Sequence, residues 1–515
     1  MSLSEGYNFA DLEDGIIIEN RDNNSFNSTE NLYSSISSDT TQQRNSTPLI
    51  TIDSDDEDEQ RLNNEINWEE LPSCAVENIY AFLSRTDQSR MSQVCSRWSD
   101  NFNSPRLWKT MKFYLPEDGY SSDIYPEVRF ARKYASMFKH VEIVCKSVKI
   151  RLIGVICRQL KLFLQAMASS SQLVSIKFIN MRNYFRRLDD THHEDLFQAI
   201  ISFFSTQENL KTVVFQDSGF SKEKGMELLK AIFHSNTMTN LTLRGFVNEA
   251  AITVFSQQYM LNLSEVCGRI ANVQSLEVDY TQIFEDIIHC LYSKISSGDY
   301  QLDKKKFGMS TLNIFCEGKR HLGFRGILPG TWKHVRNVFR DLKVKIDVTI
   351  HSHLANEMEK FLVKEIPLQS LDFRYEKFSA PSRIDISALF THLRICKYEG
   401  HLEALNVLWL PSKADFAGSI IPFVQSCENL QNLHIRVAYT PSGIENILRA
   451  LLENHPISLK SITLWFNYLN ADQPQDNLRA LSEEYYPLFK AQGIECFLFV
   501  DPSRSLRNRA RNIAP

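Results

Sequence analysis

The sequence lacks the cysteine spacing of a zinc site or of a disulfide scaffold. Its ten cysteines are spread along 515 residues, and no two of them are separated by two residues. Structural zinc sites use closely spaced cysteine pairs, and small secreted domains concentrate many cysteines in a short chain. We therefore expect no metal, no cofactor and no disulfide framework.

The short motifs of common catalytic chemistry are also missing. The sequence contains no G-x-x-x-x-G-K-[ST] phosphate loop and no G-x-S-x-G nucleophile turn. The glycines Gly323, Gly326 and Gly330 do not follow a strand in the order that a phosphate-binding loop requires. We expect no catalytic residue, and this favours a binding protein over an enzyme.

A long uncharged apolar run is missing as well. The most apolar stretch, Ile150–Met167, is interrupted by Arg151, Arg158 and Lys161. A membrane-spanning helix needs about 20 mostly apolar residues, so we expect no contact with a membrane. The acidic start of the chain is not that of a signal or transit peptide. The expected compartment is the cytoplasm, the nucleus or both.

What the sequence does contain is a strongly acidic beginning. Residues 1–65 hold 15 acidic and 3 basic side chains, whereas the remainder holds 47 acidic and 54 basic ones. Residues 1–64 are rich in Asn, Ser, Thr and Asp, and their apolar residues form small isolated groups. Such a segment cannot bury enough apolar surface to offset its ordering entropy, so the composition predicts a disordered acidic head.

One segment of this head has a specific pattern. Leu49, Ile50 and Ile52 precede a run of acidic residues, Asp53–Glu59, that only Ser54 interrupts. The pattern resembles a SUMO-interacting motif, which adds a strand to the edge of the modifier while its acids meet a basic rim. Phosphorylation of Ser54 would strengthen that pairing. Ile16-Ile17-Ile18-Glu19 is a second candidate, and the alternative is a solvated tail with incidental aliphatic residues.

From Trp68 to Trp108, apolar residues recur at helical spacing. Pro72 suits the first turn of a helix, and Asp87 is placed to cap the start of the next one. We assign residues 66–112 to this helical unit and residues 113–137 to a linker. The apolar positions that define the helices are Val76, Ile79, Phe82, Leu83, Met91, Val94, Cys95 and Trp98.

Beyond Phe138 a short unit recurs, with apolar residues at its first, fourth and sixth positions. Each copy predicts a strand, and each intervening segment predicts a helix, so residues 138–500 form a solenoid with a curved parallel sheet. The alternative is an ordinary α/β domain. A weaker copy has Lys343 at its first position, followed by Ile346 and Val348. The good copies are Phe138/Val141/Ile143, Leu173/Ile176/Phe178, Leu210/Val213/Phe215, Met238/Leu241/Leu243, Val273/Leu276/Val278, Met309/Leu312/Ile314, Leu368/Leu371/Phe373, Leu402/Leu405/Val407, Leu430/Leu433/Ile435, Leu459/Ile462/Leu464 and Ile494/Phe497/Phe499.

Residues 501–515 form a basic tail that contains four arginines. No aromatic residue lies between these arginines, so they do not predict a nucleic-acid site. They are Arg504, Arg507, Arg509 and Arg511.

The helical unit carries a family likeness in three segments. These are Trp68-Glu-Glu-Leu71-Pro72, then Val94-Cys95-Ser96-Arg97-Trp98, then Pro105-Arg106-Leu107-Trp108. In this order and spacing they resemble an F-box, although Ala75 stands where that family often has an acidic residue. The repeats that follow are similar to the leucine-rich-repeat-like solenoid of F-box only protein 39 and its relatives. That similarity lies in the segments Leu342–Lys345, Lys364–Ser370 and Ser426–Leu430.

The resemblance implies a three-helix F-box that docks on the Skp adaptor of a cullin–RING (SCF-type) ubiquitin ligase. The chain would then be a non-catalytic receptor whose solenoid binds an unknown protein substrate for ubiquitination. Two alternatives stay open, a scaffold that binds the adaptor without the cullin and a binding module for SUMO-modified nuclear partners. The implied adaptor-binding residues are Leu71, Pro72, Val76, Ile79, Phe82, Leu83, Val94, Cys95 and Trp98.

A second candidate surface follows from the repeat pattern. In such a solenoid, the strand residues between the buried positions face the concave side. The later repeats place basic and aromatic residues there, and exposed Trp and Arg are frequent anchors of protein interfaces. The candidate substrate-binding residues are Arg374, Leu408, Trp409, His434, Arg436 and Trp465.

Overall fold

The structure is a computed structural model, and the chain divides into two compact units after Phe113. The acidic head, with Leu49, Ile50, Ile52 and Asp53, lies outside the residues that the structure describes, as does the basic tail. The described residues are 68–115, 124–146, 149–248, 256–297, 308–317, 326–350, 356–375, 386–409, 416–439, 441–468 and 474–500.

The described part of the first unit is helical, as the spacing predicted. Its elements are η2 (Trp68–Glu70), α1 (Ser73–Phe82), α2 (Arg85–Met91), α3 (Ser96–Phe102) and the single turn α4 (Pro105–Trp108).

The start of α2 differs from the prediction that Asp87 caps this helix. The cap is Ser84, whose hydroxyl accepts a hydrogen bond from the Asp87 backbone N–H at 3.2 Å. The Asp87 carboxylate in turn accepts a hydrogen bond from the Ser84 hydroxyl at 2.7 Å. This reciprocal pair satisfies an N–H group that the first helical turn would otherwise leave without a partner.

The core of the first unit lies between α1, α3 and α4. Val76 and Tyr80 on α1 are completely buried. The ring of Phe102 lies 5.7 Å from that of Tyr80 and 5.0 Å, edge-on, from that of Trp108. The Tyr80 hydroxyl donates a hydrogen bond to the Trp98 carbonyl at 2.8 Å. The prediction that Val76 belongs to the adaptor-binding surface was therefore wrong, because its side chain is used inside the unit.

The second unit is built on one sheet whose strands follow each other in sequence order. Every pairing described from β2 onward is parallel. The leucine-rich-repeat-like solenoid is thus confirmed. The strands are β1 (Thr110–Leu115), β2 (His140–Cys145), β3 (Ser175–Ile179), β4 (Thr212–Gln216), β5 (Asn240–Arg244), β6 (Ser275–Asp279), β7 (Thr311–Glu317), β8 (Lys343–Ile350), β9 (Leu368–Tyr375), β10 (Ala404–Trp409), β11 (Asn432–Tyr439), β12 (Ser461–Tyr468) and β13 (Glu495–Val500).

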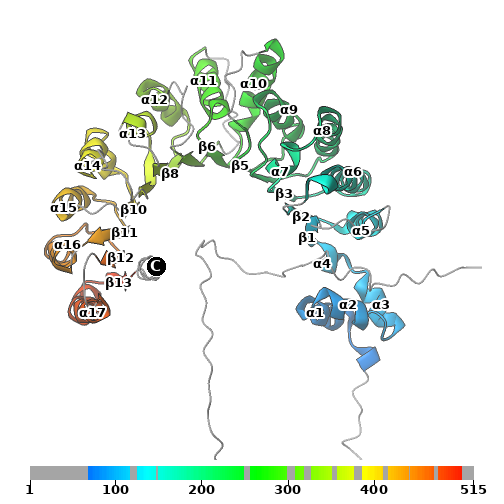
Figure 1. The fold of residues 1–515 in the computed structure, drawn as a ribbon, viewed down its shortest axis with the longest axis horizontal. Coiled ribbons are helices and arrows are strands. Elements are labelled where there is room, and N and C mark those ends of the chain that lie inside the picture. Colours follow the sequence, from blue (N-terminus) through cyan, green and yellow to red (C-terminus); the bar gives the residue numbers. More distant parts are fainter. Residues whose placement is uncertain are drawn as a thin grey trace, which may run out of the picture. The chain divides into compact units, whose positions relative to one another are not determined.

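Helices connect the strands and cover one side of the sheet. In Figure 1 the strands of this unit line the inner side of its arc and the helices lie outside. The helices are α5 (Pro126–Tyr134), η3 (Ala135–Met137), η4 (Ile150–Leu152), α6 (Ile153–Ser170), α7 (Arg182–Phe185), α8 (Asp190–Ser205), α9 (Lys222–Ile232), α10 (Gln257–Ile270), α11 (Gln282–Ser296), α12 (Pro329–Val338), α13 (Asn356–Phe361), α14 (Ile386–Ile395), η5 (Tyr398–Gly400), α15 (Phe416–Ser426), α16 (Pro441–Glu453) and α17 (Pro474–Ala491).

The repeated apolar positions form continuous rows beneath the helices. Leu371, Leu405, Leu433 and Ile462 lie side by side in four consecutive strands, and all are buried. Full burial of such a side chain contributes roughly 1.5–3 kcal/mol, so stacked repeats gain stability from their neighbours. Successive strand residues point to opposite faces, so the alternate residues form the concave face.

The boundaries of the repeats differ from the prediction at the start of the solenoid. The segment 113–137 was predicted to be a linker, but it contains the end of β1 and the helix α5. Val128, Ala131 and Tyr134 of α5 are buried, and α5 packs against α6. The sequence pattern missed this repeat because its strand, Thr110–Leu115, overlaps the end of the helical unit.

The last strand is displaced by one residue from its predicted pattern. Phe497 and Phe499 were expected at buried positions, but they are 43% and 39% exposed, whereas Cys496 is buried. The strand register aligns Cys496 with Ile462 of β12. Because strand side chains alternate between faces, a shift of one residue moves every side chain to the other face.

Helix α6 contains the apolar stretch in which no membrane span was expected. By length and composition alone, Ile150–Ser170 is long and apolar enough to cross a membrane. Within the solenoid, α6 packs against α5 and α8, and residues such as Ile156, Leu160 and Phe163 are buried. Its apolar side is therefore used in contacts between repeats.

Candidate functional site

Large apolar side chains remain outside the core of the first unit. Phe82, at the end of α1, is 90% exposed, Val94 is 63% exposed and Trp68 is 59% exposed. Of the other residues predicted to contact the adaptor, Pro72 is exposed, while Leu71, Ile79, Leu83, Cys95 and Trp98 are partly exposed. We use the name apolar docking surface for Leu71, Pro72, Ile79, Phe82, Leu83, Val94, Cys95 and Trp98.

The end of α1 is held in place by polar contacts from α2. The Gln88 side-chain amide donates hydrogen bonds to the carbonyls of Tyr80 and Leu83, at 2.6 and 3.3 Å. Helix ends leave carbonyls without intrahelical partners, and Gln88 supplies a donor to the Leu83 carbonyl and a second donor to the Tyr80 carbonyl, which also accepts from the Leu83 N–H. The turn between α1 and α2 is thereby fixed, and Phe82 stays directed into solvent.

Gln88 is itself held by a partly buried arginine. The Arg85 guanidinium donates to the Gln88 side-chain oxygen, and it lies 4.4 Å from the centre of the Trp108 ring. Burial lowers the pKa of Arg85 to about 10, so the group is still charged at neutral pH. A second contact connects α3 to η2, because the Trp98 indole N–H donates a hydrogen bond to the Trp68 carbonyl at 3.1 Å.

The concave face of the solenoid is polar and largely self-paired at β8 and β9. Arg374 contacts the carboxylates of Asp347 at 2.8 Å and Asp372 at 3.0 Å. The Asn406 amide also donates to Asp372, at 2.9 Å. Arg374 lies on the predicted face, but its charge is already matched by two carboxylates of the same chain.

Two of the predicted concave residues on β10 are buried. Trp409 is completely buried, with its ring 5.0 Å from that of Tyr375, so its assignment to the substrate-binding face was wrong. It follows Leu405 and Val407 at a spacing of two residues, and this spacing places it on their inward face. Leu408 is directed to the concave side, but it is only 9% exposed.

The remaining predicted residues lie together in the last strands. The register places Leu408, Arg436 and Trp465 in adjacent strands, while His434 is beside Thr463. His434 is partly buried, and this burial lowers its pKa, with Arg436 acting in the same direction and Asp372 opposing it. His434 is therefore neutral at neutral pH.

The structure adds two aromatic residues that the sequence pattern placed in the core. Phe499 stacks on Trp465 with their ring centres 4.5 Å apart, and Phe497 lies 6.5 Å from Phe499. Trp465, Phe497 and Phe499 therefore form an aromatic cluster at the end of the concave face, in which the two phenylalanines are exposed and Trp465 is partly exposed. The sequence signal for this arrangement is the spacing of two residues between Ile494, Cys496 and Leu498. This spacing puts the three residues on one face of the strand and Phe497 and Phe499 on the other.

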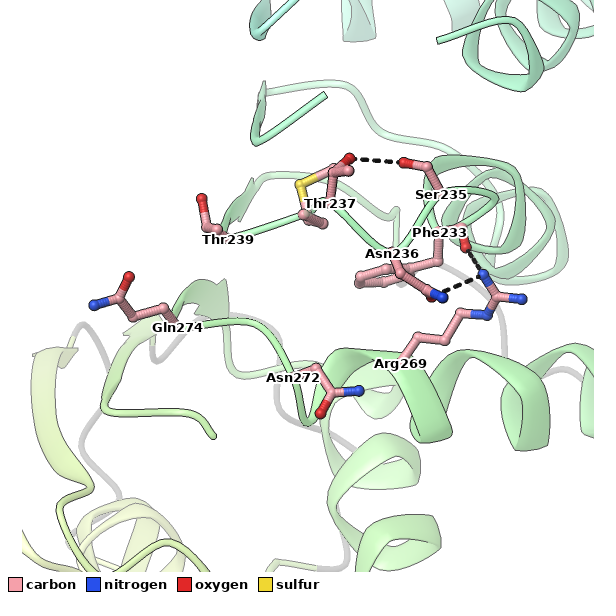
Figure 2. Close-up of a pocket in the computed structure, with 9 residues that line it drawn as sticks. Phe233, Ser235, Asn236, Thr237, Thr239, Arg269, Asn272 and Gln274 are labelled. Atoms are coloured by element: carbon pink, nitrogen blue, oxygen red, sulfur yellow. Dashed lines mark hydrogen bonds between the residues drawn. The ribbon is translucent and has the colours of Figure 1, made fainter. Parts of the chain in front are cut away.

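A pocket lies between neighbouring repeats of the solenoid. In Figure 2 its lining residues come from the segments before β5 and β6, and Arg269 points toward Phe233 and Asn236. The Arg269 guanidinium donates to the carbonyls of Phe233 and His234, so it ties α10 to the end of α9. None of the predicted site residues lines this pocket. Among the described residues, no group of three or more His, Cys, Asp or Glu side chains is arranged to hold a metal ion.

Comparisons with known proteins agree with this architecture. A model of the F-box-like family matches residues 68–114. F-box/LRR-repeat protein 21 of Bos taurus is 30% identical over 80 residues, covering 15% of this chain and 18% of its own length. The Ovis aries protein of the same name is 20% identical over 317 residues, covering 60% of this chain and 65% of its own. The matched region thus spans less than two thirds of each relative.

Among solved structures, a TLR13–ssRNA13 complex aligns with 77% of this chain and 59% of that chain. The TM-score of this alignment is 0.26, and the sequence identity is 12%. The conclusion about the chain's architecture therefore rests on the family match and on the fold itself. The chain carries an F-box-like domain at residues 68–114, followed by a leucine-rich-repeat-like solenoid.

Proposed function

We propose that this chain is a substrate-recognition subunit of an SCF-type ubiquitin ligase. The F-box-like unit binds the Skp adaptor through the apolar docking surface, and the solenoid binds the protein to be ubiquitinated. Ubiquitin transfer is performed by other subunits, so the chain itself is not catalytic. The observation that carries the proposal is the exposure of Phe82, at 90%, within a fixed helix end.

The energetics of the docking surface support a partner protein. A segment of about 45 residues has too little interior to bury all its apolar side chains. Each large apolar side chain contributes roughly 1.5–3 kcal/mol when it is fully buried. The burial of Phe82, Val94 and Ile79 by an adaptor would offset a large part of the free-energy cost of association.

The proposed target-binding surface is the aromatic cluster with its polar neighbours. Trp465, Phe497 and Phe499 provide rigid apolar area, and Arg436 and His434 flank it with hydrogen-bonding groups. Buried aromatic anchors surrounded by polar residues are typical of protein interfaces. Arg374 and Leu408, which the sequence pattern included, contribute less because one is paired within the chain and the other is nearly buried.

The direct test is co-purification of the adaptor with the double variant Leu71→Ala/Pro72→Ala. We expect loss of the adaptor with an unchanged circular dichroism spectrum, because neither side chain is buried in the core. The matched control is Ile457→Ala, which changes an apolar side chain that is fully exposed on the solenoid. Retention of the adaptor by the double variant would refute the proposal.

The cullin distinguishes the main proposal from a scaffold that binds only the adaptor. We expect cullin and adaptor to co-purify with the wild-type chain and to be lost together from the double variant. If the adaptor is present and the cullin is absent, the scaffold is the correct function.

A finer proposal concerns the acidic head. The aliphatic-acidic pattern of Leu49, Ile50, Ile52 and Asp53 supports binding of SUMO, and with it selection of SUMO-modified partners in the nucleus or cytoplasm. The test is titration of a peptide of residues 45–62 with SUMO. An absence of binding at sub-millimolar concentration would remove this part of the proposal. The likeness of the solenoid to F-box only protein 39 and its relatives likewise stays a prediction.

A further inference from the structure

A cavity of about 290 Å³, which we call the edge pocket, lies at the edge of the sheet where β3, β4 and β5 end. These three strands pair in parallel, so their carboxyl ends meet at the same edge. The lining comes from α7 and the residue after it, from the first turn of α8, and from the segments that follow β4 and β5. The lining residues are Arg182, Phe185, Arg186, His193, Gly219 and Asn248.

The edge pocket is basic, and no carboxylate is among the described residues that line it. The local sequence favours this charge, because residues 177–187 contain four basic and no acidic side chains. Two of these four, Arg182 and Arg186, line the pocket. Arg186 is exposed and has no ion pair with another described residue. Its charge is therefore available to a ligand.

Arg182 is held in place by the segment after β4. Its Nε lies 3.1 Å from the Asp217 carboxylate, and a Cβ atom added to Gly219 would lie 2.9 Å from the same nitrogen. Gly219 has a backbone φ of 66°, so glycine permits both this turn and the close approach of Arg182. Arg182 Nε is buried and makes no hydrogen bond within the described part of the chain. A buried donor of this kind indicates a water, an ion or a ligand as its partner.

His193 supplies a further donor to the edge pocket. The Lys224 ammonium lies 2.8 Å from His193 Nδ1, and because an ammonium can only donate, Nδ1 is the acceptor. Burial lowers the pKa of His193, Lys224 acts in the same direction, and Glu194 and Asp190 oppose this shift. The ring is therefore neutral at neutral pH and carries its proton on Nε2. This N–H has no hydrogen-bond partner among the described residues, whereas Lys224 is paired with Glu194 at 2.7 Å.

The chemistry of the lining matches a phosphate group. Two guanidinium groups, one imidazole N–H and one amide line the same cavity. A phosphate monoester carries about −1.5 to −2 charge at pH 7 and three acceptor oxygens, and guanidinium groups bind phosphate through paired N–H donors. A carboxylate has one charge and two oxygens, so it would leave more of these donors without a partner. Sites for drug-sized ligands measure roughly 300–1,000 Å³, so the edge pocket suits a group the size of one side chain.

We propose that the edge pocket binds the phosphate group of a phosphorylated serine or threonine side chain of a protein partner. Arg182 and Arg186 supply the positive charge, His193 and Asn248 donate hydrogen bonds to the phosphate oxygens, and Gly219 keeps Arg182 in position. The site goes beyond the proposed function. It lies in the early repeats, whereas the aromatic cluster lies on β12 and β13, and it does not require the adaptor.

The test follows the His193 ring by NMR in the full chain with ¹³C-labelled histidine, and His193→Gln identifies the signal. The probes are N-acetyl-O-phosphoserine amide, N-acetylserine amide and inorganic phosphate. We expect the phosphoserine compound to shift the His193 signal saturably, and at lower concentration than inorganic phosphate does. No shift, or the same shift with the serine compound, would overturn the proposal. Binding of inorganic phosphate at the same or a lower concentration would assign the pocket to a free ion instead.

A matched pair of variants tests the role of the exposed arginine. Arg186→Ala should weaken binding of the phosphoserine compound at least about tenfold, because the loss of one charge-assisted hydrogen bond has this effect. Arg394→Ala removes an exposed arginine of α14 and should bind like wild type. Circular dichroism should be unchanged in both variants, since neither side chain is buried. Equal affinity of wild type and Arg186→Ala would exclude this site.

The same variants separate this proposal from the adaptor-binding function. Leu71→Ala/Pro72→Ala should bind the phosphoserine compound like wild type, and Arg186→Ala should retain the adaptor. Loss of phosphoserine binding from the Leu71/Pro72 variant would contradict a site built from the solenoid alone. Each proposal can therefore fail without the other.

Discussion

The two units differ in where they place residues that depart from the rule of apolar inside and polar outside. The F-box-like unit leaves Phe82 in solvent and partly buries Arg85, whose guanidinium contacts Gln88 and the Trp108 ring. The solenoid buries Trp409 and also buries Glu127, on α5, whose side-chain oxygens have no hydrogen-bond partner among the described residues. Residue type alone therefore does not identify a binding surface. Exposure within a fixed backbone keeps Phe82 as a candidate for the proposed binding surface, whereas burial removes Trp409.

The largest expected effect is on the stability of the solenoid. Trp409→Ala removes a buried ring that stacks against Tyr375, and the free energy of unfolding should fall by about 3–5 kcal/mol. Phe82→Ala, which removes an exposed ring, should change it by less than about 0.5 kcal/mol. Urea unfolding followed by circular dichroism measures both. Equal losses in the two variants would contradict the contrast between these aromatic residues.

The next effect concerns adaptor binding by the F-box-like unit. Phe82→Asp places a charge on the most exposed side chain of the apolar docking surface, and the binding free energy should weaken by roughly 2–4 kcal/mol. Calorimetry with purified Skp adaptor measures the loss, and Ile457→Asp on the solenoid serves as the matched control. Tight binding by the Phe82 variant would show that the adaptor does not cover this helix end.

A buried carboxylate gives the solenoid a specific pH dependence. Burial raises the pKa of Glu127 from 4.5 to about 7. Because the folded state holds the proton more tightly, this group favours folding most below pH 4.5, and the contribution is lost as pH rises to about 7. The total change is at most about 3 kcal/mol. Thermal unfolding of Glu127→Gln between these pH values should lack this decline. The same decline in wild type and variant would locate its origin elsewhere.

The smallest effect is expected at the aromatic cluster. Trp465→Ala with Phe499→Ala should weaken capture of the target by about 1–3 kcal/mol, while adaptor binding stays unchanged. Quantitative cross-linking of the captured proteins measures it, with Leu261→Ala on the exposed side of α10 as control. Unchanged capture would show that the target binds to another part of the concave face.

Much of the architecture could be predicted because it depends on local periodicity. The helices of the first unit follow from apolar residues at helical spacing, and strands β2 to β12 follow from pairs such as Leu433 and Ile435 at strand spacing. The final strand was assigned one residue out of register, because Phe497 and Phe499 fit the same apolar pattern as Cys496 and Leu498. The pairing with β12 resolves this ambiguity, since it aligns Cys496 with the buried Ile462.

The candidate surfaces were only partly predictable, because local spacing does not show which neighbours a side chain meets in the folded chain. On α1 the spacing selected both Val76 and Phe82, but only contacts from α3 and α4 place the first in the core and leave the second in solvent. Arg374 was correctly placed on the concave face, but its two carboxylate partners come from β8 and β9 in the folded sheet.

By itself, the sequence determined the acidic head, the helical unit and the order of the repeats, since each depends on composition or on spacing along the chain. The tertiary structure alone decided which apolar residues stay exposed and which charges are matched. The physical reason is that burial and charge pairing depend on neighbours in space, and many of those neighbours come from other repeats.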